Sequence, residues 1–232
     1  MKKVYGLFFV LVVLVLLVVL FYKTHQDRQS IEKKVSVFSG FVNHEKAIIE
    51  QQMFAQNNKQ WPAKFNVSFF EDFIEIEILI QILSEQSVSG FDLNQVKQNW
   101  LDAIDAKYNN RFSVNAFSET IPLVFKVKFS SYKGAHRVVV GSNRFAIDTH
   151  HWSVLMDANI AAHEVGHFIG AFDEYSNGAT NEKEIYKGSL MGKNTKTGEM
   201  FPRHLKLIES KLSEILSTKA VVVLQMENEY EN

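Results

Sequence analysis

Residues 163–173 read HEVGHFIGAFD, and no other segment limits the fold of this chain as strongly. On a helix, His163 and His167 are four residues apart, so both imidazoles project from one face, one turn apart. Two imidazoles at this separation can occupy two corners of a tetrahedral Zn²⁺ site. Glu164 follows the first histidine and can act as a general base on a water molecule. The run therefore predicts a helix that carries a catalytic zinc site.

The residues after the second histidine predict where this helix ends and what completes the site. Gly170 suits a left-handed backbone conformation that ends the helix and turns the chain back. Asp173 can then deliver an oxygen as the third ligand. Glu174 and Tyr175 follow directly, and we expect them to support the ligands or to fix the loop rather than to bind the metal.

The run HExxHxxGxxD, followed by Glu and Tyr, resembles the metzincin zinc endopeptidases in a variant form with Asp as the third ligand. It is also similar to bacterial metzincin-like peptidases whose motif ends in DEY and, more loosely, to the IgA-peptidase-like family. The resemblance covers residues 61–217. It implies an α+β, metzincin-like zincin domain with a twisted mixed sheet, a zinc-site helix and a C-terminal helix.

A second segment carries the same resemblance. Residues 188–192 read GSLMG, and the resemblance implies that Met191 forms the methionine turn below the metal. Several metzincins have a tyrosine two residues after this methionine, where Lys193 stands in this chain. That tyrosine is therefore not available here, and Tyr175 is a candidate substitute. The third ligand has a competitor as well, since gluzincins use a glutamate from a later helix, which would be Glu182 or Glu184.

The N-terminus predicts a membrane anchor. Residues 4–22 contain no charge and follow Lys2 and Lys3. A helix of this length spans a hydrocarbon core of about 30 Å. No small-residue cleavage site follows Tyr22, which favours an uncleaved signal anchor at residues 1–22 over a cleaved signal peptide. A short basic N-tail usually remains cytoplasmic, so we expect a single-pass protein with an extracytoplasmic catalytic domain.

Composition limits the classes of function. The chain has 232 residues, 46% of them hydrophobic and 22% charged, which suits one globular domain plus an extension. The formal net charge of −1 gives no electrostatic basis for binding nucleic acid. The absence of cysteine excludes disulfides, a thiol nucleophile and zinc sites built from thiolates.

The remaining pattern predicts the order of elements. Apolar residues at helical spacing predict that residues 23–60 form a helical stalk or an N-terminal extension whose helix packs on the main domain, followed by the catalytic domain at 61–232. Residues 73–83 alternate isoleucine with polar residues, which predicts a strand, and Asp92 is the expected N-cap of a helix at 93–108. Other predicted elements are strands at 121–129, 137–140 and 220–226, the metal helix at 153–169 and a final helix at 203–216.

Other residues near the motif have weaker interpretations. Residues 145–149 are a candidate edge strand for pairing with an extended substrate. The remaining histidines of the site segments and the stalk are best interpreted as ordinary loop or helix-start residues; these are His44, His150, His151 and His204.

Together these observations predict a membrane-anchored zinc endopeptidase that binds one Zn²⁺ and cleaves protein or peptide substrates. Two alternatives remain: a non-catalytic protein-binding module on the same fold, and a zinc amidase that acts on cell-wall peptides. Glu164 favours an enzyme, because a binding module has no need of a general base. The sequence does not predict an oligomeric state.

Overall fold

A computed structural model describes residue 23 and residues 47–48, 52–56, 59–142, 147–175, 186, 188–193 and 195–225. The chain divides into two compact units, Met1–Asn43 and His44–Asn232. The predicted anchor at residues 4–22 lies outside the described residues. Among those that are described, no helix has the length and apolar character needed to cross a membrane.

A mixed sheet forms the body of the second unit, and eight of its strands lie in the described part of the chain. They are β1 (Ala47–Ile48), β4 (Asn66–Phe69), β5 (Ile74–Ser84), β6 (Phe112–Ala116), β7 (Glu119–Phe129), β8 (His136–Gly141), β9 (His151–Ser153) and β10 (Val221–Leu224). The path runs β1-β4-β5-β7-β6-β10, and β8 and β9 extend the sheet from β5. The helices are α2 (Gly90–Tyr108), α3 (Ala158–Phe168), the 3-10 helix η2 (Pro202–Leu205) and α4 (Lys206–Ile215). The predicted α+β class with a mixed sheet is confirmed.

The alternating pattern of β5 produces the two faces of the sheet. Ile74, Ile76, Ile78 and Ile80 are fully buried on one face, as the alternation predicts. β5 pairs in parallel with β7 over its first half and with β8 over its second half. Ile80 pairs with both neighbours, so β8 lies on the edge of β5 opposite to β7.

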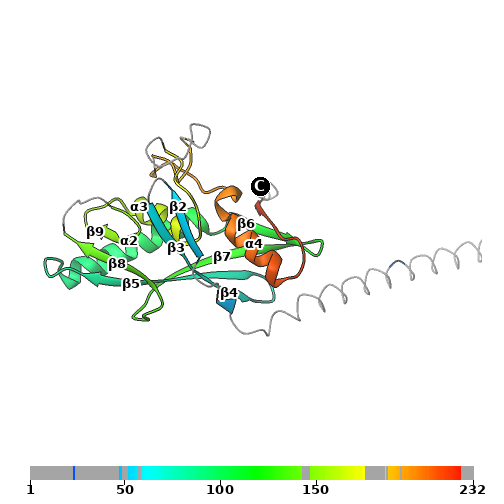
Figure 1. Ribbon diagram of the computed structural model, residues 1–232, viewed down its shortest axis with the longest axis horizontal. Helices are drawn as coiled ribbons and strands as arrows, with labels where there is room; N and C mark the ends of the chain where they lie inside the picture. The colour runs from blue at the N-terminus through cyan, green and yellow to red at the C-terminus, as the bar shows by residue number, and fades with distance from the viewer. Residues whose placement is uncertain are drawn as a thin grey trace, which may run out of the picture. The chain divides into compact units, whose positions relative to one another are not determined.

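Helices α2 and α3 cover this isoleucine face (Figure 1). On α2, Trp100 packs edge-on against Trp152 of β9 at 5.1 Å, and the Tyr108 hydroxyl donates to the carbonyl of Ala162 on α3 at 2.8 Å. Phe168 of α3 stacks on His136 of β8 at 3.9 Å. These contacts fix α3 between α2 and the sheet.

Two predicted helix starts are wrong. The N-cap of α2 is Ser89, whose side chain accepts from the backbone N–H of Asp92, so Asp92 lies in the first turn and is not the cap. Helix α3 begins at Ala158 instead of residue 153, because the Asp157 side chain accepts from the Asn159 N–H and caps it. The preceding residues 151–153 pair with β8 as strand β9.

The predicted helical stalk at 23–60 is also wrong wherever the structure describes it beyond residue 23. Residues 47–48 form β1, and β2 (Gln52–Gln56) pairs with β3 (Lys59–Ala63) as an antiparallel hairpin. The hairpin belongs to the second unit, so the predicted domain boundary at 61 divides a pair of strands. The pairing of β1 with β4 and of β2 with β3 determines the conformation of these residues, and their local apolar spacing does not.

Candidate metal centre

Helix α3 presents the first two predicted ligands and the predicted base. His163, Glu164 and His167 are all buried, at 6%, 5% and 5% exposure. The helix ends where the sequence predicts, since Gly170 has φ +91° and its N–H donates to the carbonyl of His167. A side chain at Gly170 would approach Phe54 and Leu207 within about 3 Å, which gives the glycine a steric reason in addition to its backbone conformation.

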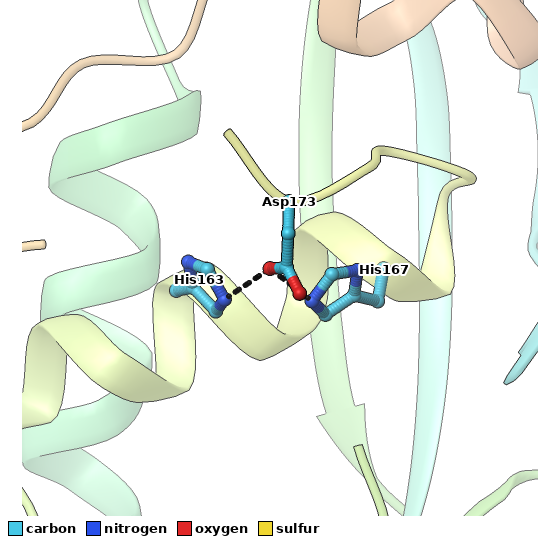
Figure 2. Close-up of side chains that lie close together, drawn as sticks. All are labelled: His163, His167 and Asp173. Carbon is cyan, nitrogen blue, oxygen red and sulfur yellow. Dashed lines mark ion pairs between the residues drawn. The ribbon is translucent and has the colours of Figure 1, made fainter. Parts of the chain in front are cut away.

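The turn after Gly170 returns Asp173 to the face of α3 that carries the histidines. Figure 2 shows the carboxylate of Asp173 between the two imidazoles. Its Oδ1 lies 3.2 Å from Nε2 of His163 and 3.2 Å from Nε2 of His167. Ligand atoms bound about 2.0–2.1 Å from one zinc ion at the tetrahedral angle lie roughly 3.3 Å apart. The two distances from Asp173 therefore match a tetrahedral metal site, and all three ligand atoms lie within 4.8 Å of one another.

The opposite ring nitrogens fix the tautomers of both histidines. Nδ1 of His163 donates to the carbonyl of Leu190 at 2.8 Å, and Nδ1 of His167 donates to the carbonyl of Ala171 at 2.9 Å. Because Nδ1 carries a proton in each ring, Nε2 faces Asp173 and can bind either a proton or a metal ion. Backbone carbonyls in this role orient metal-binding histidines and raise their basicity.

The charges of the site call for a cation at its centre. Asp173 is 7% exposed, and its Oδ1 accepts no hydrogen bond from the described residues. Burial raises the pKa of this carboxyl, but contact with the two imidazoles outweighs burial and holds the pKa well below its usual value. A buried carboxylate oxygen that faces two imidazole nitrogens is stable only with a proton or a metal ion among them. Two imidazoles and one carboxylate are a ligand set that suits Zn²⁺.

The carboxylate of Glu164 is free to act as a general base. It forms no hydrogen bond or ion pair with the described residues. Burial raises its pKa above the usual value, and the nearby His163 and His167 oppose this shift. A carboxyl with a raised pKa, next to a candidate metal site, is suited to accept and return a proton.

Tyr175 contacts the ligand carboxylate directly. Its hydroxyl donates to Oδ2 of Asp173 at 2.9 Å, which leaves Oδ1 to face the histidines. Burial and the neighbouring negative charge raise the pKa of Tyr175, so the hydroxyl stays protonated. The predicted role of Tyr175 in supporting the ligands matches this geometry.

Gln56 of β2 is a site residue that the sequence did not indicate. Its side-chain amide donates to the carbonyl of Asp173 at 3.0 Å and accepts from the Asp173 N–H at 2.9 Å. Gln56 is 5% exposed and precedes Asp173 by 117 positions. No local motif links residues so far apart, and the helical interpretation of this segment concealed the strand.

An aromatic cluster places the β2–β3 hairpin against the second histidine. The Trp61 ring packs edge-on against His167 at 5.0 Å and against Phe172 at 5.5 Å. Phe54 contacts both Trp61 and Phe172, at 6.1 and 5.5 Å. The loop that carries Asp173 is therefore packed on a hairpin from the start of the second unit.

Met191 lies directly beneath the helix, as its predicted role requires. It is fully buried, and its N–H donates to the Ser189 hydroxyl while its carbonyl accepts from the Glu174 N–H. A Cβ added to Gly166 of α3 would collide with the Met191 sulfur, so only glycine permits this contact. The turn also supplies the Leu190 carbonyl that orients His163.

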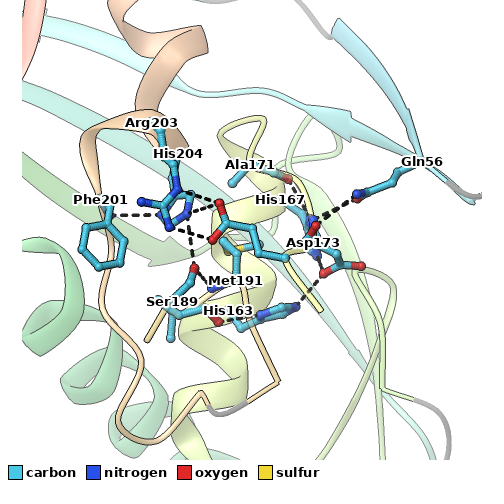
Figure 3. A network of polar contacts seen from close by, with 12 residues as sticks. Gln56, His163, His167, Ala171, Asp173, Ser189, Met191, Phe201, Arg203 and His204 are labelled. Atoms are coloured by element: carbon cyan, nitrogen blue, oxygen red, sulfur yellow. Dashed lines mark hydrogen bonds and ion pairs between the residues drawn. The ribbon is translucent and has the colours of Figure 1, made fainter. Parts of the chain in front are cut away.

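Glu174 fixes the C-terminal segment to this turn and does not reach the metal ligands. Arg203 donates to both of its carboxylate oxygens, at 2.7 and 2.8 Å, and Nε2 of His204 lies 3.1 Å from Oε1 (Figure 3). Burial raises the pKa of Glu174, but hydrogen bonds from Arg203, His204 and Ser189 lower it to about 2. His204, predicted to be an ordinary helix-start residue, is buried in this network.

Other residues singled out in the sequence lie elsewhere. His150 and His151 are exposed and are not part of the ligand cluster. Lys193 is exposed. His44, Glu182 and Glu184 lie outside the described residues, as do residues 145 and 146 of the proposed edge strand, while residues 147–149 are not assigned to a strand.

Comparisons with protein-family models, with curated proteins and with solved structures find no match to this chain.

Proposed function

We propose that this chain is a zinc-dependent endopeptidase of the metzincin type. The observation that carries the proposal is the arrangement of His163, His167 and Asp173 around one point, with the free carboxylate of Glu164 on the same helix. Met191 beneath α3, and the order of sheet, metal helix, methionine turn and final helix, agree with the resemblance in the sequence.

The residues divide the chemistry among them. A zinc ion bound by the three ligands supplies a Lewis acid and lowers the pKa of water. The carboxylate of Glu164 takes a proton from a water molecule as this water attacks the peptide carbonyl. It then returns the proton to the leaving nitrogen. Its raised pKa assists the second step, because burial makes the protonated carboxyl easier to form than in an ordinary glutamate. Tyr175 and Gln56 hold Asp173 in place throughout.

The proposal extends to the setting of the enzyme. Residues 4–22 anchor the chain in a membrane by their length and lack of charge, and the short basic N-tail favours an extracytoplasmic catalytic domain. The substrates are then proteins or peptides near the membrane surface.

Cleavage of casein by the full chain, purified in non-ionic detergent, tests this function. We expect activity that a chelator abolishes and added Zn²⁺ restores. Glu164→Gln should retain zinc but lose at least about 100-fold in rate, because it removes general base catalysis. Glu214→Gln, at a 69% exposed side chain, is the matched control and should be fully active.

Three outcomes would contradict the proposal. Activity that survives Glu164→Gln or chelation excludes the zinc mechanism. Stoichiometric zinc without cleavage of casein or of a peptide library indicates a binding module. Cleavage of cell-wall peptides alone indicates an amidase.

A further inference from the structure

The face of the sheet opposite α2 and α3 carries charged residues. They are paired at one end of this face and unpaired at the other. Beside the first half of β5 the charges are paired. Lys126 lies 3.3 Å from Glu75, and Lys128 lies 2.7 Å from Glu77. Strand alternation brings each lysine of β7 next to an acid of β5, so this end is locally neutral.

Beside the second half of β5, the same face contains a cavity of about 590 Å³. Its walls include Leu83 of β5, Arg137 and Val139 of β8, and His151 of β9. The register shows which face this is, because His151 precedes Trp152, which points the other way and packs on Trp100 of α2. These four residues therefore point away from α2, whereas His136, which also lines the cavity, stacks on Phe168 of α3.

The cavity is lined by cations that have no counter-ion in the described part of the chain. Lys64, Lys133 and Arg137 line it, and no described aspartate or glutamate does. Lys133 and Arg137 are exposed and form no ion pair with any described residue. Lys64 donates to the carbonyl of Gly134 at 2.7 Å, which is a neutral acceptor.

The histidines of the cavity, His136 and His151, add little to its positive charge. His151 contacts an acid, with Nδ1 3.0 Å from Oδ1 of Asp148. His136 is neutral, because burial lowers its pKa to about 4, and its Nε2 contacts the carbonyl of Lys64 at 2.8 Å. Three basic side chains thus line one cavity in a protein whose formal net charge is −1.

We propose that this cavity is a binding site for an acidic peptide segment. Its volume lies in the range of about 300–1,000 Å³ that is typical of ligand sites. The three cations come from separate segments, and apolar side chains of Pro62, Leu83 and Val139 lie among them. Spaced carboxylates on a chain with aliphatic stems match this arrangement better than one compact anion does.

The site and the metal centre can be tested separately, since neither the three metal ligands nor Glu164 lines the cavity. If the proposed function holds, the occupant is an acidic stretch of the substrate that binds away from the cleaved bond. Binding of an acidic peptide to the metal-free protein tests the cavity even if no peptidase activity exists.

Calorimetric titration of the metal-free full chain with a hexaglutamate peptide tests the proposal. We expect binding that weakens as salt is added, and no binding of hexaglutamine. The double variant Lys133→Glu with Arg137→Glu should weaken binding at least tenfold. The double variant Lys196→Glu with Lys219→Glu makes the same change in net charge at exposed lysines outside the cavity and should bind as the wild type does.

Three outcomes would overturn the proposal: equal loss of binding in both double variants, no loss in either, or inorganic phosphate that binds as tightly as the peptide. If the charge-reversed cavity variant fails to fold, Lys133→Gln with Arg137→Gln replaces it, with the same expected direction.

Discussion

The candidate metal centre has a helix-borne half and a loop-borne half, and the two are built differently. His163 and His167 lie on consecutive turns of α3, so the geometry of one helix sets their separation. Asp173 lies on the loop after Gly170, and two residues from outside α3 fix its position: Gln56 bonds its backbone and Tyr175 bonds its carboxylate.

This difference has a thermodynamic consequence. A ligand on a helix is positioned whenever the helix forms, so its orientation needs only the carbonyls that accept from Nδ1. A ligand on a loop has lost backbone freedom that must be offset by specific contacts. We therefore expect the loop-borne half to respond to substitutions at distant positions, such as Gln56, and the helix-borne half to respond mainly to its own residues.

The largest effects should come from removing a ligand of either half. We expect His167→Ala and Asp173→Ala each to lower zinc affinity by more than about 100-fold, because loss of partners outside the ligand set already costs about 10–100-fold. Zinc content after dialysis against a graded chelator measures this. If Asp173→Ala retains wild-type affinity, the loop-borne half is not part of the metal site.

Gln56→Ala should give the next largest effect on zinc affinity, and it most directly tests the comparison between the two halves. It removes both hydrogen bonds to the Asp173 backbone without touching a ligand, and we expect about a tenfold loss of zinc affinity. Gln52→Ala, an exposed glutamine of the same strand, is the control and should have no effect. An unchanged affinity in Gln56→Ala would show that the loop is fixed without the hairpin.

The local part of the site was predictable from the sequence, and the part that depends on distant residues was not. The ligands, the base and the glycine turn lie within 11 consecutive residues, where helical spacing and backbone preference suffice. Strand β5 was predicted because its isoleucines alternate with polar residues. Gln56 and strands β2, β4 and β9 were missed, because these strands are too short to show an alternating pattern and gain their stability from pairing with β3, β5 and β8.

Glu174 offers a pH test of the loop-borne half. Its pKa falls from an ordinary value of 4.5 to about 2 in the folded protein, so it adds stability above pH 4.5 that is lost as the pH falls toward 2. We expect Glu174→Gln to cost on the order of 2 kcal/mol at pH 7, allowing for solvent screening. Urea unfolding of the metal-free protein should show the gap between wild type and variant closing below pH 4.5. A gap independent of pH would mean that the charge of Glu174 contributes nothing.

Gly166→Ala should give the smallest effect on stability. It tests whether the helix-borne half depends on contacts outside α3. The added methyl group meets the Met191 sulfur and comes within 3.3 Å of the Tyr108 hydroxyl, so we expect a loss of about 1–2 kcal/mol from overpacking, after the better helix propensity of alanine. Gly90→Ala, where the added group meets nothing within 4 Å, should be neutral or slightly stabilising.

Zinc affinity distinguishes the two explanations of a destabilised Gly166→Ala protein. Displacement of Met191 moves the Leu190 carbonyl that accepts from Nδ1 of His163, so the turn transmits strain to one ligand and not to the other. If the methionine turn only fills space, stability falls and zinc affinity stays constant. If it orients His163, both fall together, and the helix-borne half then depends on tertiary structure through this single carbonyl.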